Sequence, residues 1–298
     1  MKYNLKPIDQ QVIVITGASS GIGLATAAMA AGKGARLVLA ARSEQVLQEL
    51  VSEILASGAE AICVVADVGR RQEMEDVAAA AIERFGRIDT WVNNAGVAIY
   101  GRLEEVNEQD SRRLFDTNFW GVVNGSLAAM PHLRQSKGAL INVGSEVSEA
   151  VVPLQGMYSA SKHAVKGFTD SLRVELLAEK TPVSVTLIQP TAVNTPYPEH
   201  ARNYMEKEPK LPSPQIDPKQ VATAIIDAAA SAERDVKVGA MAKLDTNLAN
   251  LMPKLADWMA KKQVTRQSYE AAPIDPEGTL YKAGDSGRIH GRPPEARA

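Results

Sequence analysis

Three side chains in the middle of the sequence have types and spacing suited to moving a proton. Tyr158 and Lys162 stand four residues apart, so on a helix they share one face, and Ser145 lies thirteen residues before Tyr158. A tyrosine with its ordinary pKa near ~10 needs roughly 4 kcal/mol of stabilisation of the phenolate to act as a base near neutral pH. A nearby ammonium such as that of Lys162 favours the phenolate. The alternative is an ordinary exposed helix face, because Tyr-x-x-x-Lys alone has little specificity.

A glycine-rich segment near the N-terminus has the pattern of a phosphate-binding turn. Between an apolar β-branched run and a helical pattern stands Thr16-Gly17-Ala18-Ser19-Ser20-Gly21-Ile22-Gly23. Glycine is needed where a Cβ would collide with a phosphate or the next strand, and the free N–H groups of a helix N-terminus attract an anion. The spacing is G-x-x-x-G-x-G, not the commoner G-x-G-x-x-G. Glycines that serve only the backbone are the alternative, but the position between strand and helix favours a nucleotide site.

The end of the second expected strand bears on which nucleotide would bind. Sites that prefer NAD place an acidic residue about 20 residues beyond the glycines, where it accepts a hydrogen bond from the ribose 2′-OH. Ala41 stands at that place here and is followed by Arg42 and Ser43. A guanidinium and a hydroxyl suit a 2′-phosphate, so the sequence predicts NADP (NADPH) as the cofactor. The alternative is that Arg42 merely begins a surface helix.

Short apolar runs alternate with longer helical patterns along most of the chain. The runs barely alternate apolar with polar residues, as strands buried on both faces do. They cover residues 12–15, 36–40, 61–65, 89–93, 139–143, 183–188 and 235–238. This repetition predicts an α/β fold, a doubly wound parallel sheet of the Rossmann type with helices on both faces. We assign residues 1–240 to this domain and expect the proline-rich residues 191–218 to form a substrate lid loop.

Residues 241–298 lack this alternation of strand and helix patterns, and we assign them to a C-terminal extension. Apolar residues between Leu244 and Trp258 predict an amphipathic helix with a kink at Pro253. Its polar face mixes both charges, which favours a packed helix or a subunit contact over a membrane surface. Residues 273–298 are rich in glycine, proline and charge, so we expect an extended or disordered tail. Because every nucleotide motif precedes Pro196, we expect cofactor binding to survive removal of this tail.

Composition excludes several classes of protein. The chain has 298 residues and a formal net charge of −2, which gives no electrostatic reason to expect a nucleic-acid partner. The single cysteine, Cys63, cannot form an intrachain disulfide, and the four histidines lack metal-ligand spacing, so we expect no bound metal. No apolar run is long enough to span a membrane and no signal peptide is evident, so we expect a cytoplasmic protein.

Further motifs follow in the order found in the short-chain dehydrogenase/reductase superfamily, which the sequence resembles from about Val12 to Val238. They are Asp67-Val68, Asn93-Asn94-Ala95-Gly96, Asn118, Ser145, Tyr158-Ser159-Ala160-Ser161-Lys162 and Pro190 to Thr195. The resemblance implies that Tyr158 exchanges a proton with the substrate oxygen, and that Lys162 lowers the tyrosine pKa and holds the nicotinamide ribose. It also implies that Ser145 hydrogen-bonds the substrate oxygen and that Asn118 holds a proton-relay water with Lys162.

The same resemblance implies a cofactor site assembled from several loops. Its expected members are Gly17, Ser19, Ser20, Gly21, Ile22, Gly23, Arg42, Ser43, Asp67, Val68, Asn93, Ala95, Gly96, Tyr158, Lys162, Val193 and Thr195. One departure from the family pattern is Thr191, which stands where the family has glycine, so the local turn is expected to differ. Members of the superfamily commonly pair helices into dimers and tetramers, so a homodimer or homotetramer is expected.

Together these features predict an NADP-dependent oxidoreductase of the short-chain dehydrogenase/reductase type, which transfers hydride between nicotinamide and a carbonyl or secondary alcohol carbon. The alternative is a catalytically silent NADP-binding regulatory or scaffold protein. The presence of Asn118, Ser145, Tyr158 and Lys162 counts against that alternative. The expected partner is a small-molecule carbonyl or alcohol, whose identity the sequence does not specify.

Overall fold

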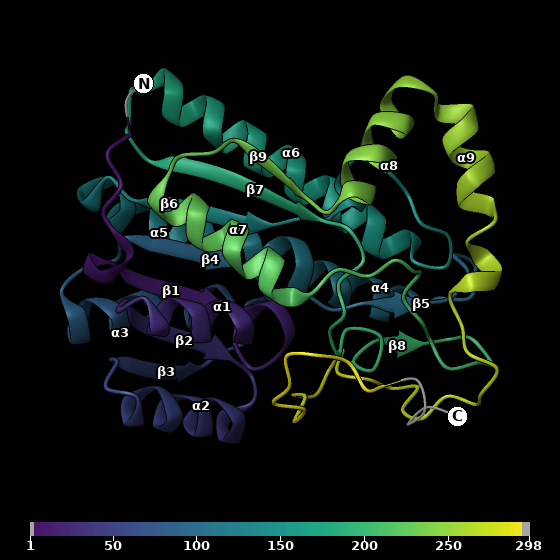
Figure 1. Cartoon of the computed structure of the whole chain (residues 1–298), viewed down its shortest axis with the longest axis horizontal. Helices are drawn as coiled ribbons and strands as arrows, with labels where there is room; N and C mark the ends of the chain where they lie inside the picture. Colours follow the sequence, from purple (N-terminus) through teal and green to yellow (C-terminus); the bar gives the residue numbers. More distant parts are fainter. Residues whose placement is uncertain (1–2, 294–298) are drawn as a thin grey trace.

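One central parallel sheet organises the protein in the computed structural model, which describes residues 3–293 (Figure 1). Seven strands form the sheet in the order β3-β2-β1-β4-β6-β7-β9. Their bounds are β1(Val12–Thr16), β2(Arg36–Ala41), β3(Ala61–Val65), β4(Thr90–Asn93), β6(Ala139–Val143), β7(Ser184–Pro190) and β9(Asp235–Val238). The predicted doubly wound parallel sheet is therefore confirmed, and all of its strands were expected from the sequence.

The strand order reverses at β1, and this reversal opens the crevice in which ligands of such sheets bind. Val14 of β1 pairs with Val38 of β2 on one side and with Trp91 of β4 on the other. The chain leaves β1 and β4 toward opposite faces of the sheet, so the loops that follow these neighbouring strands separate. The glycine turn begins at Gly17, directly after β1, and therefore lies at this crevice.

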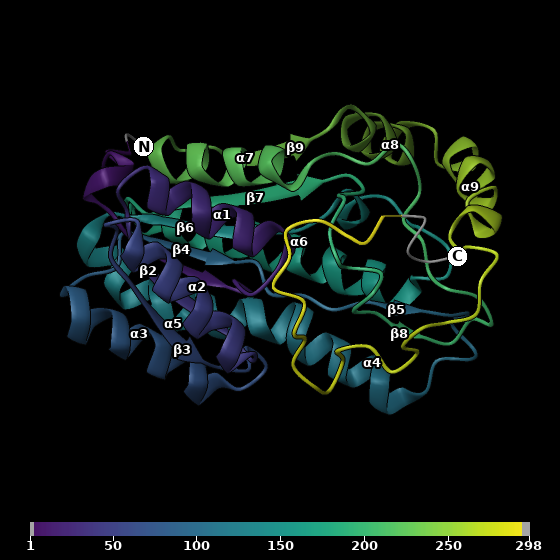
Figure 2. The same ribbon diagram turned by 60° about the horizontal axis from the view of Figure 1, so that its bottom comes forward.

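Two layers of helices cover the sheet (Figure 2). Successive residues of β1 serve opposite faces, because Ile13 and Ile15 belong to one apolar core and Val12 and Val14 to the other. This double burial is why the strand sequences are continuously apolar. The helices of one face are α1(Gly21–Gly32), α2(Glu44–Ala56) and α7(Pro218–Ala230), and those of the other are α3(Arg71–Phe85), α5(Gly121–Ser136) and α6(Gly156–Ala178).

A long helical rod precedes β6. It begins with α4(Glu108–Phe115), passes through a π-helical turn, η2(Asp116–Trp120), and continues as α5. Single π-turns inside helices are frequent at functional sites because they re-aim side chains. Short 3₁₀ turns occur at η1(Ile8–Gln10), η3(Glu146–Ser148) and η4(Val264–Arg266).

A second, two-stranded parallel sheet joins β5(Ile99–Tyr100) to β8(Arg202–Asn203). The sequence did not predict it, because two-residue strands are too short to leave a periodic pattern. Strand β8 lies within residues 191–218, which are otherwise irregular up to the start of α7 at Pro218.

The C-terminal extension begins with two helices in place of the single kinked helix that was expected. They are α8(Ala240–Leu251) and α9(Pro253–Lys261), separated at Met252. Much of their apolar surface faces solvent, since Leu251 is 81% exposed and Trp258 is 56% exposed. No helix of the described part of the chain is long and apolar enough to cross a membrane.

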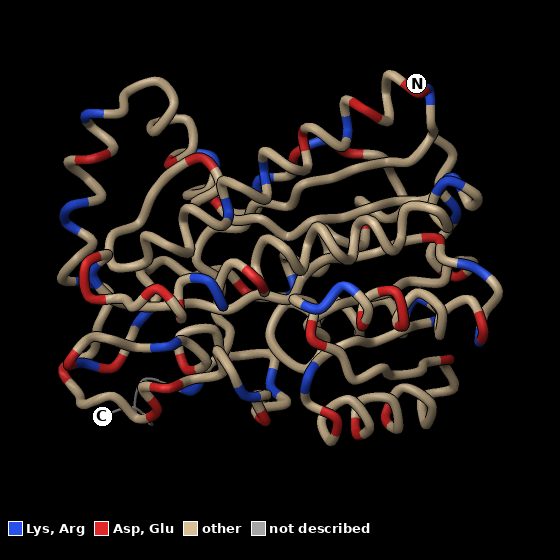
Figure 3. Tube along the Cα trace, turned by 180° about the vertical axis from the view of Figure 1, so that it is seen from behind, with Lys and Arg blue, Asp and Glu red and all other residues tan. Residues whose placement is uncertain are grey.

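After α9 the chain runs back across the molecule as an irregular segment, residues 267–293 (Figures 1 and 2). The absence of helices and strands agrees with the expected extended tail, whose last residues, 294–298, lie outside the described residues. The expectation of little burial is wrong at Gly278 and Leu280, because both residues are buried. Basic and acidic residues are both spread over the backbone in Figure 3, although α2 carries acidic residues alone.

Candidate active site

A cavity of about 260 Å³ lies at the carboxyl ends of β1, β2, β4 and β6. It brings together most of the residues that the sequence singled out, although they come from loops far apart in the chain. The predicted residues that line it are Gly17, Ser19, Ser20, Gly21, Ile22, Arg42, Ser43, Asp67, Val68, Ala95, Gly96, Ser145, Tyr158, Lys162, Val193 and Thr195. Three predicted residues, Gly23, Asn93 and Asn118, lie outside its lining.

The glycines of the turn after β1 are required by close approaches of the backbone. A Cβ on Gly17, whose φ is +65°, would lie 2.7 Å from the Cα of Ala95. A Cβ on Gly23 would lie 2.1 Å from the carbonyl oxygen of Gly17, so Gly23 shapes the turn without lining the cavity. Gly21 has φ +54° and faces the side chain of Thr195 across the cavity. The glycines therefore allow the tight turn into α1 that the sequence predicted.

Asn93 has a structural position beneath the cavity. Its Nδ2 donates hydrogen bonds to Ser126 Oγ at 3.0 Å and Asn142 Oδ1 at 2.8 Å, which ties β4 to α5 and β6. The residue that lines the cavity is its neighbour Asn94, whose Nδ2 donates to the carbonyl oxygen of Gly17 at 3.1 Å. The motif therefore lies at the cavity, but the asparagine that lines the cavity is Asn94 and not the predicted Asn93.

The opposite end of the cavity, at the end of β2, carries a cluster of charged side chains. Arg113 pairs with Asp67, with Nη2 2.5 Å from Oδ2. Burial alone would raise the pKa of the Asp67 carboxyl, but the Arg113 hydrogen bond and the charges of Arg113 and Arg42 hold it below its usual value. Burial and the charge of Arg113 lower the pKa of Arg42. Asp67 is thus an ionised acceptor beside two guanidinium groups.

The C-terminal tail forms part of the cavity wall, contrary to the expectation that it lies apart from the nucleotide motifs. Thr279 and Gly284 line the cavity. Arg42 donates from Nη2 to the carbonyl oxygen of Thr279 at 2.5 Å and from Nη1 to that of Leu280 at 3.2 Å. The carbonyl oxygen of Arg288 accepts from the Gly21 amide at 2.9 Å. Composition could not reveal these contacts, because backbone carbonyls make all three of them.

The side chains predicted to move a proton, Ser145, Tyr158 and Lys162, meet at one side of the cavity. Tyr158 and Lys162 lie one turn apart near the start of α6, with Lys162 Nζ 5.7 Å from the Tyr158 ring centroid. Lys162 is buried, and its Nζ donates to the carbonyl oxygen of Val143 at 2.8 Å. Ser145 caps the 3₁₀ turn η3, where its Oγ accepts from the Val147 amide, and it also hydrogen-bonds the Tyr158 hydroxyl.

The pKa values of this group are dominated by burial. Burial raises the pKa of Tyr158 to about 12, hydrogen bonds with Tyr197 and Ser145 partly offset this, and the charge of Glu146 adds to it. Burial lowers the pKa of Lys162 to about 8. Burial therefore favours the phenol form of Tyr158, which can donate a proton, and the lowering of its pKa by Lys162 stays a prediction.

Asn118 sits in the π-helical turn η2, directly behind the cavity. Its Oδ1 accepts from the Val97 amide at 2.8 Å, and its Nδ2 donates to the Val97 carbonyl oxygen at 3.0 Å and to Ser161 Oγ at 3.2 Å. A Cβ added to Gly96 would lie 3.5 Å from Asn118 Oδ1 and 3.9 Å from Lys162 Nζ. Asn118 thus lies close to Lys162 and fixes the loop that carries Gly96.

Glu146 is a cavity residue that the sequence reasoning missed. It follows Ser145 directly, lines the same cavity, and has one carboxyl oxygen, Oε2, that is buried without a hydrogen-bond partner among the described residues. Burial raises the pKa of Glu146 to about 7, while a hydrogen bond with Thr191 lowers it and the charge of Asp245 on α8 raises it. Adjacency to Ser145 was the only sequence signal that could have identified it.

Thr191, the departure from the family pattern, fits without an unusual backbone. It is absent from the described non-glycine residues with positive φ. Space for its side chain comes from Gly239, where a Cβ would lie 2.6 Å from the Thr191 Cγ2. Tyr197, from the following loop, completes this side of the cavity with its ring edge-to-face against Tyr158 and its hydroxyl donating to Gln155 Oε1 at 2.8 Å.

Comparison with known proteins places these features in a family. Residues 11–206 match the family model described as short chain dehydrogenase. The chain is 47% identical over 288 residues to the uncharacterised oxidoreductase YxnA of Bacillus subtilis, covering 95% of this chain and 81% of that protein.

Two solved structures also resemble the chain. A short-chain dehydrogenase/reductase from Burkholderia phymatum in complex with NAD has 30% identity and a TM-score of 0.77, covering 84% of this chain and 96% of that one. An alcohol dehydrogenase from Thermococcus sibiricus complexed with 5-hydroxy-NADP has 27% identity and a TM-score of 0.68, covering 76% and 95% respectively.

Proposed function

The chain belongs to the short-chain dehydrogenase family, and on that premise we propose that it is an NADP-dependent oxidoreductase acting on a carbonyl or secondary alcohol. The observation that carries the proposal is that Ser145, Tyr158 and Lys162 line the same cavity as the glycine turn. A nucleotide held at the start of α1 would extend along this cavity, so its far end would meet the acid/base group.

The preference for NADP is supported by the end of β2. Arg42 and Ser43 line the cavity there, whereas Ala41 offers no carboxylate to a ribose 2′-OH. A guanidinium favours a phosphate by charge as well as by hydrogen bonding. Two of the Arg42 nitrogens already donate to tail carbonyls, but a guanidinium has five N–H groups and so keeps donors for a phosphate.

The residues around Tyr158 suit proton transfer to a substrate oxygen. A nicotinamide, when bound, supplies or accepts the hydride. In the reductive direction Tyr158, a phenol with a pKa of about 12, donates its proton to the oxygen that becomes the alcohol, while Ser145 holds that oxygen by a hydrogen bond. Lys162 places its ammonium beside the tyrosine ring and stabilises the phenolate that results.

A turnover assay tests this proposal. NADPH and NADH oxidation would be followed at 340 nm (a general property of reduced nicotinamides) with a panel of ketones, aldehydes, quinones and sugars. We expect turnover with at least one carbonyl and a higher kcat/KM with NADPH. Binding of NADPH without turnover of any carbonyl or alcohol would instead favour the silent regulatory protein, an alternative that the similarity to oxidoreductases does not favour.

We also propose that the chain pairs with copies of itself, as the superfamily resemblance implies. Exposed apolar side chains on η2, α5 and α6, the helical segments that carry or follow Asn118 and Tyr158, support this proposal. Trp120 is 51% exposed, Leu127 is 45% exposed and Val174 is 64% exposed. Light scattering at several protein concentrations tests it, and a constant monomer mass would refute it.

A further inference from the structure

The C-terminal tail divides into an anchored part and a polar arm. The anchor is Leu280, which is fully buried in a cluster with Val97, Ile99 and Leu114. Tyr281 adds a hydrogen bond from its hydroxyl to Asp110 Oδ1 at 2.8 Å. The arm, residues 284–293, contains no buried residue. Since the arm has no core of its own, it can move while Leu280 stays in place.

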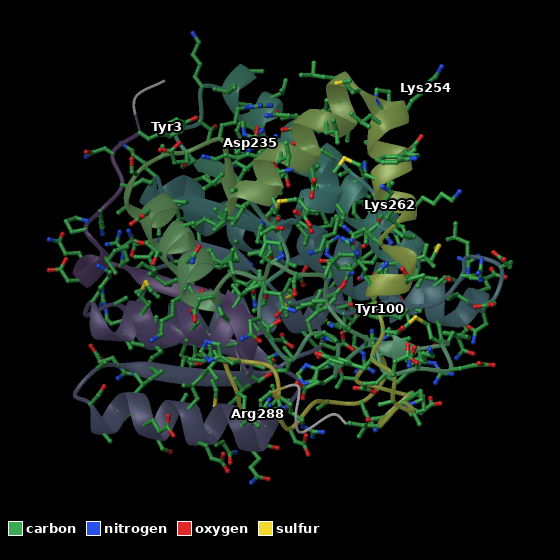
Figure 4. The ribbon with its side chains drawn as sticks, turned by 45° about the vertical axis from the view of Figure 1, so that its right-hand side comes forward. Tyr3, Tyr100, Asp235, Lys254, Lys262 and Arg288 are labelled. Carbon is green, nitrogen blue, oxygen red and sulfur yellow. The ribbon has the colours of Figure 1, made fainter. Side chains whose placement is uncertain are left out.

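The arm crosses the cavity at the first turn of α1. Arg288, labelled in Figure 4, lies on the yellow C-terminal segment beside the purple N-terminal part of the chain. Its carbonyl oxygen accepts from the Gly21 amide at 2.9 Å, and Gly284 lines the cavity. The Gly21 amide is the first N–H of α1, one of the groups whose partial positive charge attracts a phosphate.

Three tail carbonyls thus accept hydrogen bonds from donors of the candidate cofactor site. Thr279 and Leu280 take two N–H groups of Arg42, and Arg288 takes the Gly21 amide. Resting on the proposed function, we propose that the arm is an intramolecular competitor of the dinucleotide: it covers the pyrophosphate position and must swing away before the cofactor binds. Thr279 and Leu280, held by the anchor, stay in place and keep Arg42 oriented.

Ion pairs hold the arm closed. Arg288 pairs with Glu199 at 2.6 Å, and Arg292 pairs with the same carboxylate through its side chain at 3.4 Å and through its amide at 2.6 Å. His290 lies 2.9 Å from Asp217, at the start of α7. The Glu199 side chain is only 10% exposed and receives two arginines, so it is the contact whose removal most directly opens the arm.

Competition of this kind has a distinctive signature. If the cofactor binds only the open form, the observed dissociation constant is the intrinsic constant divided by the open fraction. Opening the arm therefore speeds association and leaves dissociation nearly unchanged. The pyrophosphate is common to NADPH and NADH, so both gain by the same factor. A change at Arg42, by contrast, separates the two cofactors.

Stopped-flow measurement of cofactor binding tests the proposal on four full-length or shortened chains. They are the natural chain, Glu199→Gln, a chain ending at residue 283, and Lys282→Gln. The last is the matched control, because Lys282 lies in the tail but, among the described residues, forms an ion pair only with the exposed Asp275. We expect Glu199→Gln and the shortened chain to associate about three- to tenfold faster with both NADPH and NADH. We expect Lys282→Gln to behave like the natural chain.

Two results would overturn the proposal. Faster dissociation with weaker binding in Glu199→Gln would mean that the arm retains the bound cofactor, and unchanged rates in both variants would mean that it lies aside. The point variant keeps the test decisive if the shortened chain does not fold. Failure of the natural chain to bind either dinucleotide would instead contradict the proposed function, so the two failures are distinguishable.

Discussion

The ammonium of Lys162 donates a hydrogen bond to the carbonyl oxygen of Val143 at 2.8 Å, which joins helix α6 to the last residue of β6. Two residues after Val143 comes Ser145, so this one bond fixes the relative positions of the candidate acid/base group and the candidate substrate ligand. The bond also satisfies a buried charge that would otherwise be costly, since Lys162 is only 4% exposed.

Lys162→Met should therefore weaken both binding and chemistry. It removes the ammonium beside Tyr158 and leaves the Val143 carbonyl without its donor. We expect turnover to fall by about 10²- to 10⁴-fold and the dissociation constant for NADPH to rise. Steady-state kinetics and fluorescence titration measure the two effects, with circular dichroism to confirm folding. Turnover near that of the natural chain would remove Lys162 from the catalytic group.

Tyr158→Phe separates chemistry from binding more cleanly. The substitution removes only the hydroxyl that exchanges the proton, and the ring keeps its edge-to-face contact with Tyr197. We expect turnover to be lost and the dissociation constant for NADPH to change little. Retention of turnover within about tenfold, equivalent to a loss of only ~1.4 kcal/mol, would contradict the assigned role.

Arg42→Ala tests the choice of cofactor. Only NADPH presents a phosphate to the guanidinium, so its binding should weaken about ten- to hundredfold more than that of NADH, the range for a charged hydrogen bond of about 1.5–3 kcal/mol. Loss of the Arg42 hydrogen bonds to Thr279 and Leu280 should affect the binding of both cofactors equally. The ratio of the two dissociation constants is therefore the quantity to compare. Equal losses would assign Arg42 to holding the tail alone.

Glu146→Gln should change how stability depends on pH. The pKa of Glu146 rises from 4.5 in the unfolded chain to about 7 in the folded protein. The unfolded state therefore loses its proton first, and the free energy of unfolding falls by roughly 3 kcal/mol as the pH rises from about 4 to above 7. Glutamine, which does not ionise, should flatten this decline. Urea unfolding at several pH values measures it, and parallel curves for the two proteins would contradict the assigned pKa.

Leu280→Ala tests whether the tail is part of the folded core. Leu280 is fully buried, so truncation should lower the free energy of unfolding by about 2–5 kcal/mol. Leu251→Ala is the matched control, because Leu251 is 81% exposed and its loss should have little effect. Denaturant titration gives both values. Equal, small effects would show that the tail adds nothing to stability.

The sequence was sufficient for the sheet, and most of the predicted site residues line one cavity, because both depend on local patterns. The apolar runs of the strands, the glycine turn and the Tyr158–Lys162 spacing are each readable within a few residues. The sequence could not show that Asn93 points away from the cavity, because adjacent residues in a loop can face opposite ways. The direction depends on hydrogen-bond partners such as Asn142, which is far away in the sequence. Oligomeric state, cytoplasmic location and the NADP preference stay predictions.

The tail contacts were beyond sequence reasoning for a different reason. Arg42 and Leu280 are 238 residues apart, and the acceptor on the tail is a backbone carbonyl that any residue could supply. Composition indicated a segment without helices or strands, as the described residues of the tail show. It did not show that the side chain of Leu280 packs against Val97 and Leu114 in a buried cluster.

The path of the tail also sets an order of events during synthesis. Proteins grow from the N-terminus, and the early elements fold first. Val97 and Leu114 are made well before Leu280, so the apolar cluster that they form stays uncovered while the 166 residues from 115 to 280 are added. A nascent chain that stops before Leu280 would carry every motif of the candidate active site and yet leave the apolar cluster that Leu280 covers exposed. Such a product is one that chaperones and proteases would recognise.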